Sequence, residues 1–325
     1  MNSLADVYLD NFGHGLGDQK FTIEETCGSG LTFSSLDVLA DSGFEAHHVC
    51  SENQSAYDLA KTAVDQIATG RSPKSLSDIN AILYATCLTC NGNMGSWQSF
   101  VDTKDVKSLM DFPASHLQSD FDMDNAFVMG VNQTACTSLL GAIRLAKSLL
   151  QTEQQFQDIL CLTADRFPNG AIYEQGYNLI SDGAAGCIVS KSKGAFRIID
   201  CHQISNGAMA QANDDETAGF YFNYTHRLIQ EILSNNNLDV RDVAWIVPQN
   251  TNIKAWQIMS SLLNISFDQV LMPTRTSIGH CISGDNIINL KTCNDAGKFK
   301  RGDLILMPMA GFGLNWSCIL IEKEN

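Results

Sequence analysis

The chain has 325 residues and a formal net charge of −15. This charge argues against nucleic acid and acidic membranes as partners, because both attract clustered cations. Hydrophobic residues make up 44% and charged residues 18%, a balance typical of a globular chain with a sizeable core. No run approaches the roughly 18 apolar residues of a membrane span. The first residues also lack the pattern of a secretory signal.

The sequence contains 11 cysteines at irregular spacing. An odd, scattered set does not suggest a disulfide framework, and free thiols indicate a reducing, cytoplasmic location. Cys87 and Cys90 form a CxxC pair, but no second pair at similar spacing completes a zinc site. We therefore expect no metal or other cofactor, and we assign the pair to packing or to a substrate pocket that includes Cys90 and Met94.

Apolar periodicity in the first half predicts alternating helices and strands. Residues 56–69 have helical spacing, and a polar turn then leads to the apolar run 79–85. The predicted order is helix 56–69, strand 79–85, strand 126–131, helix 138–150, and strands 158–164 and 187–191.

The second half repeats this plan. The counterparts are helix 222–233, strand 243–247, strand 269–272, a helix from about residue 286, and strands 303–310 and 318–323.

Two copies of this alternation predict an α/β fold of two pseudo-symmetric halves with mixed sheets. We expect mostly parallel strands, with one antiparallel edge strand from each closing hairpin. No linker rich in Pro, Gly or Ser separates residues 1–192 from residues 193–325. The two halves are therefore expected to form one compact unit around a pseudo-twofold axis.

Cys136 lies between a predicted strand and the helix that follows it. A thiol at the N-terminus of a helix has a lowered pKa, and thiolate is the form that attacks a thioester. His280 lies in the equivalent turn of the second half. A pseudo-twofold axis brings the two turns together, so His280 can serve as a base or as the partner of a thiolate. The alternatives are a structural cysteine and a histidine that caps its own turn.

Gln249 and Asn250 follow the predicted strand 243–247, where neutral amides can donate hydrogen bonds to a thioester carbonyl. We expect Asn250 and Asn252 to bind substrate, although a solvated strand end is the simpler interpretation. Gly313 lies in the turn of the last hairpin, and its N–H with that of Cys136 would form an oxyanion hole. An ordinary hairpin turn is the alternative there.

Taken in order, these segments resemble the ketoacyl-ACP synthase type III branch of the thiolase superfamily over nearly the whole chain. The resemblance implies a thiolase fold, with helices layered between and outside the two halves. The segments that carry it are Gln133-Thr-Ala-Cys-Thr-Ser138, Ser181-Asp-Gly-Ala-Ala-Gly-Cys187, Val247-Pro-Gln-Asn-Thr-Asn252, Ser277-Ile-Gly-His280 and Gly311-Phe-Gly-Leu-Asn-Trp316.

The chain departs from the family pattern at three positions. Gln249 replaces the usual histidine, and His280 replaces the usual asparagine, so the Cys-His-Asn set becomes Cys136, Gln249 and His280. The arginine associated with coenzyme A binding is also missing. His47 and His48 lie near its place, and we expect both at the surface.

The resemblance implies an acyltransferase or condensing enzyme that forms an S-acyl intermediate on Cys136 from acyl-CoA or an acyl carrier protein thioester. A small-molecule acceptor then receives the acyl group, in secondary metabolism or in fatty-acid or polyketide-type biosynthesis. Glutamine cannot exchange a proton near neutral pH, which disfavours the housekeeping decarboxylation. A decarboxylating ketosynthase that uses His280, and a non-catalytic subunit of a ketosynthase heterodimer, remain alternatives. We expect a homodimer, and Lys254 is the candidate contact for an acidic carrier.

Overall fold

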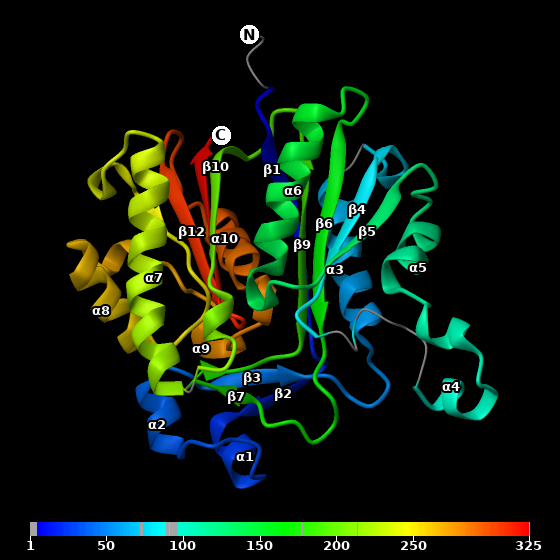
Figure 1. Cartoon of the computed structure of the whole chain (residues 1–325), viewed down its shortest axis with the longest axis horizontal. Helices are drawn as coiled ribbons and strands as arrows, with labels where there is room; N and C mark the ends of the chain where they lie inside the picture. The colour runs from blue at the N-terminus through cyan, green and yellow to red at the C-terminus, as the bar shows by residue number, and fades with distance from the viewer. Residues whose placement is uncertain are drawn as a thin grey trace.

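The structure is a computed structural model that describes residues 5–71, 74–88, 91, 97–176, 178–212 and 214–324. Its main sheet has nine strands within this part of the chain (Figure 1). From edge to edge these are β11 (Trp245–Ile246), β12 (Leu304–Gly311), β13 (Asn315–Lys323), β10 (Phe196–Ser205), β1 (Tyr8–Leu16), β9 (Gly183–Ser190), β6 (Asp158–Asp165), β4 (Ala81–Ala85) and β5 (Phe127–Val131).

The two expected sheets are joined into one. The junction is a short antiparallel pairing of β1 with β10, in which Tyr8 lies opposite Arg197 and Leu9 opposite Phe196. Strands β4, β5 and β6 are parallel, as expected, and so are β11 and β12. The mixed α/β architecture predicted from the repeat is confirmed.

Two details of the predicted sheet are wrong. The closing strands β9 and β13 are antiparallel to their neighbours, but they lie inside the sheet, between β6 and β1 and between β12 and β10. The edges are β5 and β11 instead. The strand predicted at 269–272 is reduced to a single bridge between Ile246 and Val270, because a turn of 3-10 helix occupies residues 267–269.

Four long helices match the predicted ones and cover the sheet. Buried residues of α6 (Ser138–Thr152) and α10 (Asp285–Asp295) share one hydrophobic cluster between the halves. Helix α3 (Ala56–Arg71) packs outside the first half, and α7 (Asp214–Asn235) packs outside the second. This arrangement confirms helices between and outside the halves, and it brings the N-terminal ends of α6 and α10 to the centre.

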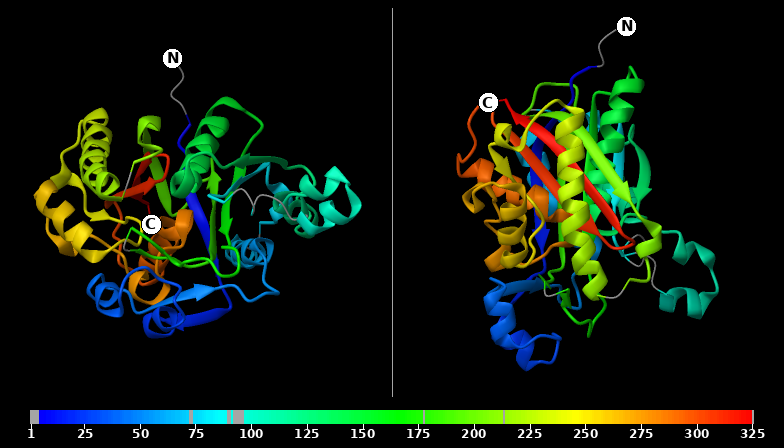
Figure 2. Two further views of the ribbon diagram at one scale, coloured as in Figure 1. Left: turned by 60° about the horizontal axis from the view of Figure 1, so that its bottom comes forward. Right: turned by 60° about the vertical axis from the view of Figure 1, so that its left-hand side comes forward.

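The remaining elements surround this core (Figure 2). A two-stranded pair and two short helices lie at one end of the sheet, and α4 projects from the body beside α5 (Figure 1). None of the helices in the described ranges is long and apolar enough to cross a membrane. The helices and strands outside the main sheet and the four helices above are α1 (Ile23–Gly28), α2 (Leu36–Asp41), α4 (Trp97–Thr103), α5 (Pro113–Asp120), α8 (Ile253–Leu263), α9 (Arg275–Ile278), β2 (Gln19–Thr22), β3 (Ala46–Val49), β7 (Glu174–Gln175) and β8 (Asn178–Leu179).

Candidate active site

Cys136 lies in a strained turn between β5 and α6. The turn is a short 3-10 helix, η4 (Ala135–Thr137), and Ala135 has φ = 46°, a left-handed conformation that costs an alanine free energy. The end of β12 presses against it, since a Cβ atom on Gly311 would lie 2.8 Å from the Cys136 nitrogen. Glycine is therefore required there for the turn to hold Cys136 in place.

The equivalent turn of the second half meets this one. It contains the short helix η8 (Ile282–Gly284), and Ile282 repeats the left-handed backbone with φ = 47°. The Ser283 hydroxyl donates a hydrogen bond to the Ala135 carbonyl at 3.2 Å. Counted back from the two helix starts, the residue equivalent to Cys136 is Ser283. The prediction that the turns meet is thus confirmed, although His280 lies three residues before the equivalent position.

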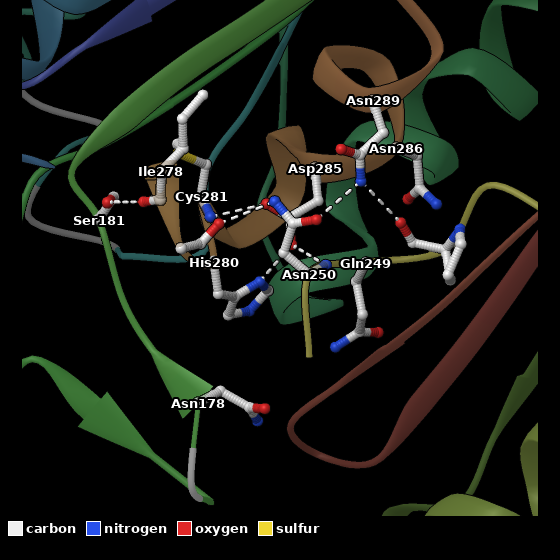
Figure 3. A network of polar contacts seen from close by, with 12 residues as sticks. Asn178, Ser181, Gln249, Asn250, Ile278, His280, Cys281, Asp285, Asn286 and Asn289 are labelled. Atoms are coloured by element: carbon white, nitrogen blue, oxygen red, sulfur yellow. Dashed lines mark hydrogen bonds and ion pairs between the residues drawn. The ribbon is translucent and has the colours of Figure 1, made fainter. Parts of the chain in front are cut away.

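His280 is buried and joins Cys136 to a carboxylate. Its Nδ1 donates to Asp285 Oδ2 at 2.5 Å, and the ring also makes a hydrogen bond with Cys136. Because Nδ1 is engaged, Nε2 remains for the sulfur. The same carboxylate accepts from the backbone N–H groups of Cys281 and Asn250, both at 2.7 Å (Figure 3). Asp285 is fully buried, and its contacts fix both the position and the tautomer of the imidazole.

The electrostatics of the pair favour thiolate and imidazolium. A hydrogen bond from Cys87 and the contact with His280 outweigh burial and lower the pKa of Cys136 to about 5. Burial alone would lower the pKa of His280, but Asp285 and the Cys136 contact raise it to about 10. Proton transfer from the thiol to the imidazole is therefore favourable in the resting site.

Gln249 lies beside this pair on the cavity wall. Its side-chain oxygen accepts a hydrogen bond from the Ala310 N–H at 2.5 Å, which fixes the amide. The oxygen is thereby occupied, so the NH₂ group is the end left for a ligand. Gln249 can serve as a neutral donor here, as its place after strand 243–247 suggested.

Asn250 has a different place from the one expected. It is fully buried and is absent from the cavity wall, so we no longer assign it to substrate binding. Its amide donates to Thr274 Oγ1 and the Gly279 carbonyl and accepts from Asn289 Nδ2, at 2.8–3.0 Å. Asn250 therefore links the turn before His280, through the Gly279 carbonyl, to Asn289 of α10 (Figure 3).

A cavity of about 320 Å³ opens onto the reactive groups. Its wall is largely apolar, and Tyr221, Phe222 and Trp316 supply aromatic surface. Such a concave, mostly apolar site with a few polar groups at one end is typical of small-ligand binding. Cys136, Gln249 and His280 supply the polar end.

The other predicted residues are distributed around the cavity. Asn252 lines it and caps α8, and Lys254 lines it with a half-exposed side chain that pairs with Asp41 at 3.4 Å. Gly313 is absent from the wall, whereas its neighbours Phe312 and Leu314 belong to it. Cys90 and Met94 lie outside the described residues.

The expectation that His47 and His48 lie at the surface is wrong. The His47 ring is buried between the Ile180 carbonyl and the Thr26 hydroxyl, and burial lowers its pKa to about 4. His48 is half-buried, and its Nδ1 lies 3.0 Å from the Gly17 carbonyl. Burial lowers the pKa of both rings, and each lies within hydrogen-bond distance of a backbone carbonyl, so neither supplies the fixed positive charge of an arginine.

Two family models match the chain. Residues 131–207 match 3-oxoacyl-[acyl-carrier-protein] synthase III, and residues 233–323 match its C-terminal model. Among curated proteins, the β-ketoacyl-[acyl-carrier-protein] synthase III of Rickettsia bellii (strain OSU 85-389) is 24% identical over 300 residues. That match covers 86% of this chain and 88% of the relative.

Solved structures share the fold over almost the whole chain. The 3-oxoacyl-[acyl-carrier-protein] synthase III of Aquifex aeolicus VF5 superposes with a TM-score of 0.77 at 17% identity, covering 97% of this chain and 99% of that one. ChlB3, titled an acyltransferase, has a TM-score of 0.80 at 17% identity and covers 98% of both chains.

Proposed function

The chain belongs to the ketoacyl-ACP synthase III-like branch of the thiolase superfamily, a family of condensing acyltransferases, and we propose that it transfers an acyl group through a thioester on Cys136. The buried contact of Cys136 with His280, whose ring is hydrogen-bonded in turn to Asp285, carries this proposal. In it, the half 1–192 supplies the nucleophile, and the half 193–325 supplies Gln249 and His280.

In the first step, the Cys136 thiolate attacks the carbonyl carbon of an acyl thioester. The tetrahedral intermediate collapses as the carbon–sulfur bond to the donor breaks, and the His280 imidazolium gives its proton to the departing thiolate. The products are free donor thiol, S-acyl Cys136 and neutral His280. Asp285 keeps the ring oriented throughout.

In the second step, neutral His280 accepts a proton from a hydroxyl or amine acceptor. The acceptor oxygen or nitrogen attacks the acyl carbon, and the bond to Cys136 breaks to release thiolate. The proton on His280 and the charge on Cys136 restore the resting pair. The same imidazole thus serves as acid and then as base, as in other cysteine and serine acyl transferases.

The developing oxyanion needs donors. In our proposal the Cys136 N–H and the Gly313 N–H provide them, with the Gln249 NH₂ beside them. The two backbone N–H groups and the Gln249 amide are neutral and cannot supply a proton. Neutral donors suit acyl transfer better than they suit the polarisation of a malonyl group for decarboxylation.

We propose that the donor is acyl-CoA or an acyl carrier protein and that it enters past Lys254 and Asn252. We also propose a role in secondary metabolism, because Gln249 and His280 replace the residues usual in the family.

Replacing Gln249 with histidine separates transfer from decarboxylation. Wild-type protein should release donor thiol from acyl-CoA in the presence of an alcohol or amine acceptor, with little CO₂ from malonyl-CoA. Gln249→His should gain CO₂ release by about tenfold or more, because imidazolium is the stronger donor. Rapid CO₂ release by the wild type, lost in His280→Ala, would select the decarboxylating alternative instead.

We further propose that the chain forms a homodimer through β5. Among the strands of the described residues, this edge strand has one hydrogen-bonded neighbour, β4, and it exposes Met129 and Gly130. An unpaired edge with exposed apolar surface favours pairing with a second strand. A heterodimer with a related chain would use the same edge.

A further inference from the structure

A second thiol lies beside the nucleophile. Strands β5, β4 and β6 are parallel neighbours, so their carboxyl ends meet at one edge of the sheet. Cys136 follows β5, Cys87 follows β4, and Asp165 ends β6. The pairing of β4 with β5 extends one residue further, since Thr86 N–H donates to the Val131 carbonyl at 3.2 Å.

Asp165 fixes the backbone around Cys87. Its Oδ1 accepts from the Thr86 hydroxyl at 2.6 Å, from Cys87 N–H at 2.9 Å and from Leu88 N–H at 3.2 Å. The carboxyl group is 1% exposed, and burial raises its pKa to about 6 against the effect of these hydrogen bonds. A buried carboxyl group with three donors on one oxygen makes this turn rigid, and the turn determines where the Cys87 thiol lies.

The paired ends of β4 and β5 bring the Cys87 thiol beside Cys136, and a hydrogen bond between the two side chains is the first cause of the lowered pKa of Cys136. When Cys136 is ionised it can only accept, so Cys87 is the donor. The sulfur of Cys136 is then held from two sides, by Cys87 from the sheet edge and by His280 from the opposite turn. Buried thiols elsewhere in the described chain, such as Cys161 and Cys281, have their pKa raised by burial.

We propose that Cys87 is a positioning residue of the acyl transfer, whose thiol donates a hydrogen bond to the Cys136 sulfur and holds it, with His280, as an anion facing the cavity. This inference rests on the proposed role of Cys136, and it gives a role to Cys87 of the CxxC pair, which has no second pair of ligands for a zinc site. Because an S–H group is a weak donor, the effect should be partial and should be retained by a hydroxyl.

The test is the pH dependence of Cys136 alkylation by iodoacetamide in the full-length protein. The extent of modification of the Cys136 peptide is measured by mass spectrometry from about pH 4 to about pH 9. We expect the midpoint in Cys87→Ala to rise by about one pH unit, and the midpoint in Cys87→Ser to rise by less than about half of that. Cys50→Ala, which removes a buried thiol elsewhere, should leave the midpoint unchanged.

An unchanged midpoint in Cys87→Ala overturns the proposal. A shift in Cys87→Ser equal to that in Cys87→Ala also overturns it, because a serine hydroxyl can still donate a hydrogen bond to Cys136 whereas alanine cannot. Circular dichroism at each pH verifies folding, and Cys87→Val replaces the alanine variant if the smaller side chain unfolds the site. The assay requires no acyl donor. The alkylation of Cys136 and the transfer of an acyl group are therefore measured independently, and a failure of one is distinguished from a failure of the other.

Discussion

Asp285 keeps His280 protonated beside Cys136, and this residue was not predicted from the sequence. It begins α10, where an acidic side chain ordinarily stabilises the helix N-terminus, so the sequence alone suggests a cap. The structure instead directs the carboxylate at the imidazole and at two backbone N–H groups. The spacing of five residues from His280 is visible only after the turn through η8 is known.

Asp285→Asn should lower the rate of acyl transfer by about 10²- to 10⁴-fold, because an amide neither favours imidazolium nor fixes the tautomer. The rate is measured as thiol release from acyl-CoA. Asp295→Asn provides the control, since Asp295 lies exposed at the other end of α10 in a pair with Lys291. A loss of less than about threefold in Asp285→Asn would contradict the assigned role of this carboxylate.

The rate of acyl loading should depend on pH at both ends of the range. The pKa of Cys136 is lowered to about 5, so below this pH the thiol is protonated and loading slows. The pKa of His280 is raised to about 10, so above that pH the ring cannot protonate the departing thiolate. Between these values the rate should be nearly constant, as measured by rapid-quench mass spectrometry. A limb centred near pH 8.5, the value of a free thiol, would contradict the ion pair.

At the scale of elements, the contact between β12 and η4 determines the position of the nucleophile. Gly311→Ala would place a Cβ atom 2.8 Å from the Cys136 nitrogen and 2.9 Å from the Thr134 carbonyl oxygen. We expect a loss of about 1–3 kcal/mol of stability from this overpacking, and a large loss of acyl loading.

The control is Gly219→Ala in α7, where an added Cβ has, apart from its chain neighbours and the backbone of its own helix, no heavy atom of the described residues within 4 Å. This substitution should leave the unfolding midpoint unchanged or slightly raised, because alanine favours a helix over glycine. Chemical denaturation of both variants provides the comparison. A Gly311→Ala protein as stable and as active as wild type would show that the turn can relax.

The apolar elements were predictable, whereas those with mixed sequences were not. Helices α3 and α6 have clear periodicity and strand β4 is a continuous apolar run, and the structure confirms all three. Strand β1 contains Asp, Asn, Gly and His. It lies at the centre of the sheet only because β9 and β10 pair with it, one on each side. Its place depends on long-range pairing, which no local pattern encodes.

For the molecule as a whole, the internal repeat predicted the central fact that the two halves meet at Cys136 and His280. The repeat could not show whether a given side chain faces the cavity. Gln249 and Asn250 are adjacent, yet Gln249 lines the cavity and Asn250 turns into the buried network of α10. The direction of each amide is determined by partners distant in sequence.

The edge strand β5 predicts the oligomeric state. Wild-type protein should have about twice the 35.5 kDa mass of one chain in light scattering after gel filtration. Met129→Lys places a charge on the exposed edge and should give monomers. Leu262→Lys, at an exposed apolar position of α8, should remain dimeric. A monomeric wild type, or a dimeric Met129→Lys, would exclude this interface.

The most direct measurement is the intact mass of the protein after incubation with a panel of acyl-CoA and acyl carrier protein thioesters. We predict a mass increase of one acyl group on the wild type, located at Cys136 and discharged by a hydroxyl or amine acceptor. Cys136→Ala should gain no mass. A wild type that never acquires the group, or an adduct that persists in Cys136→Ala, would contradict the account.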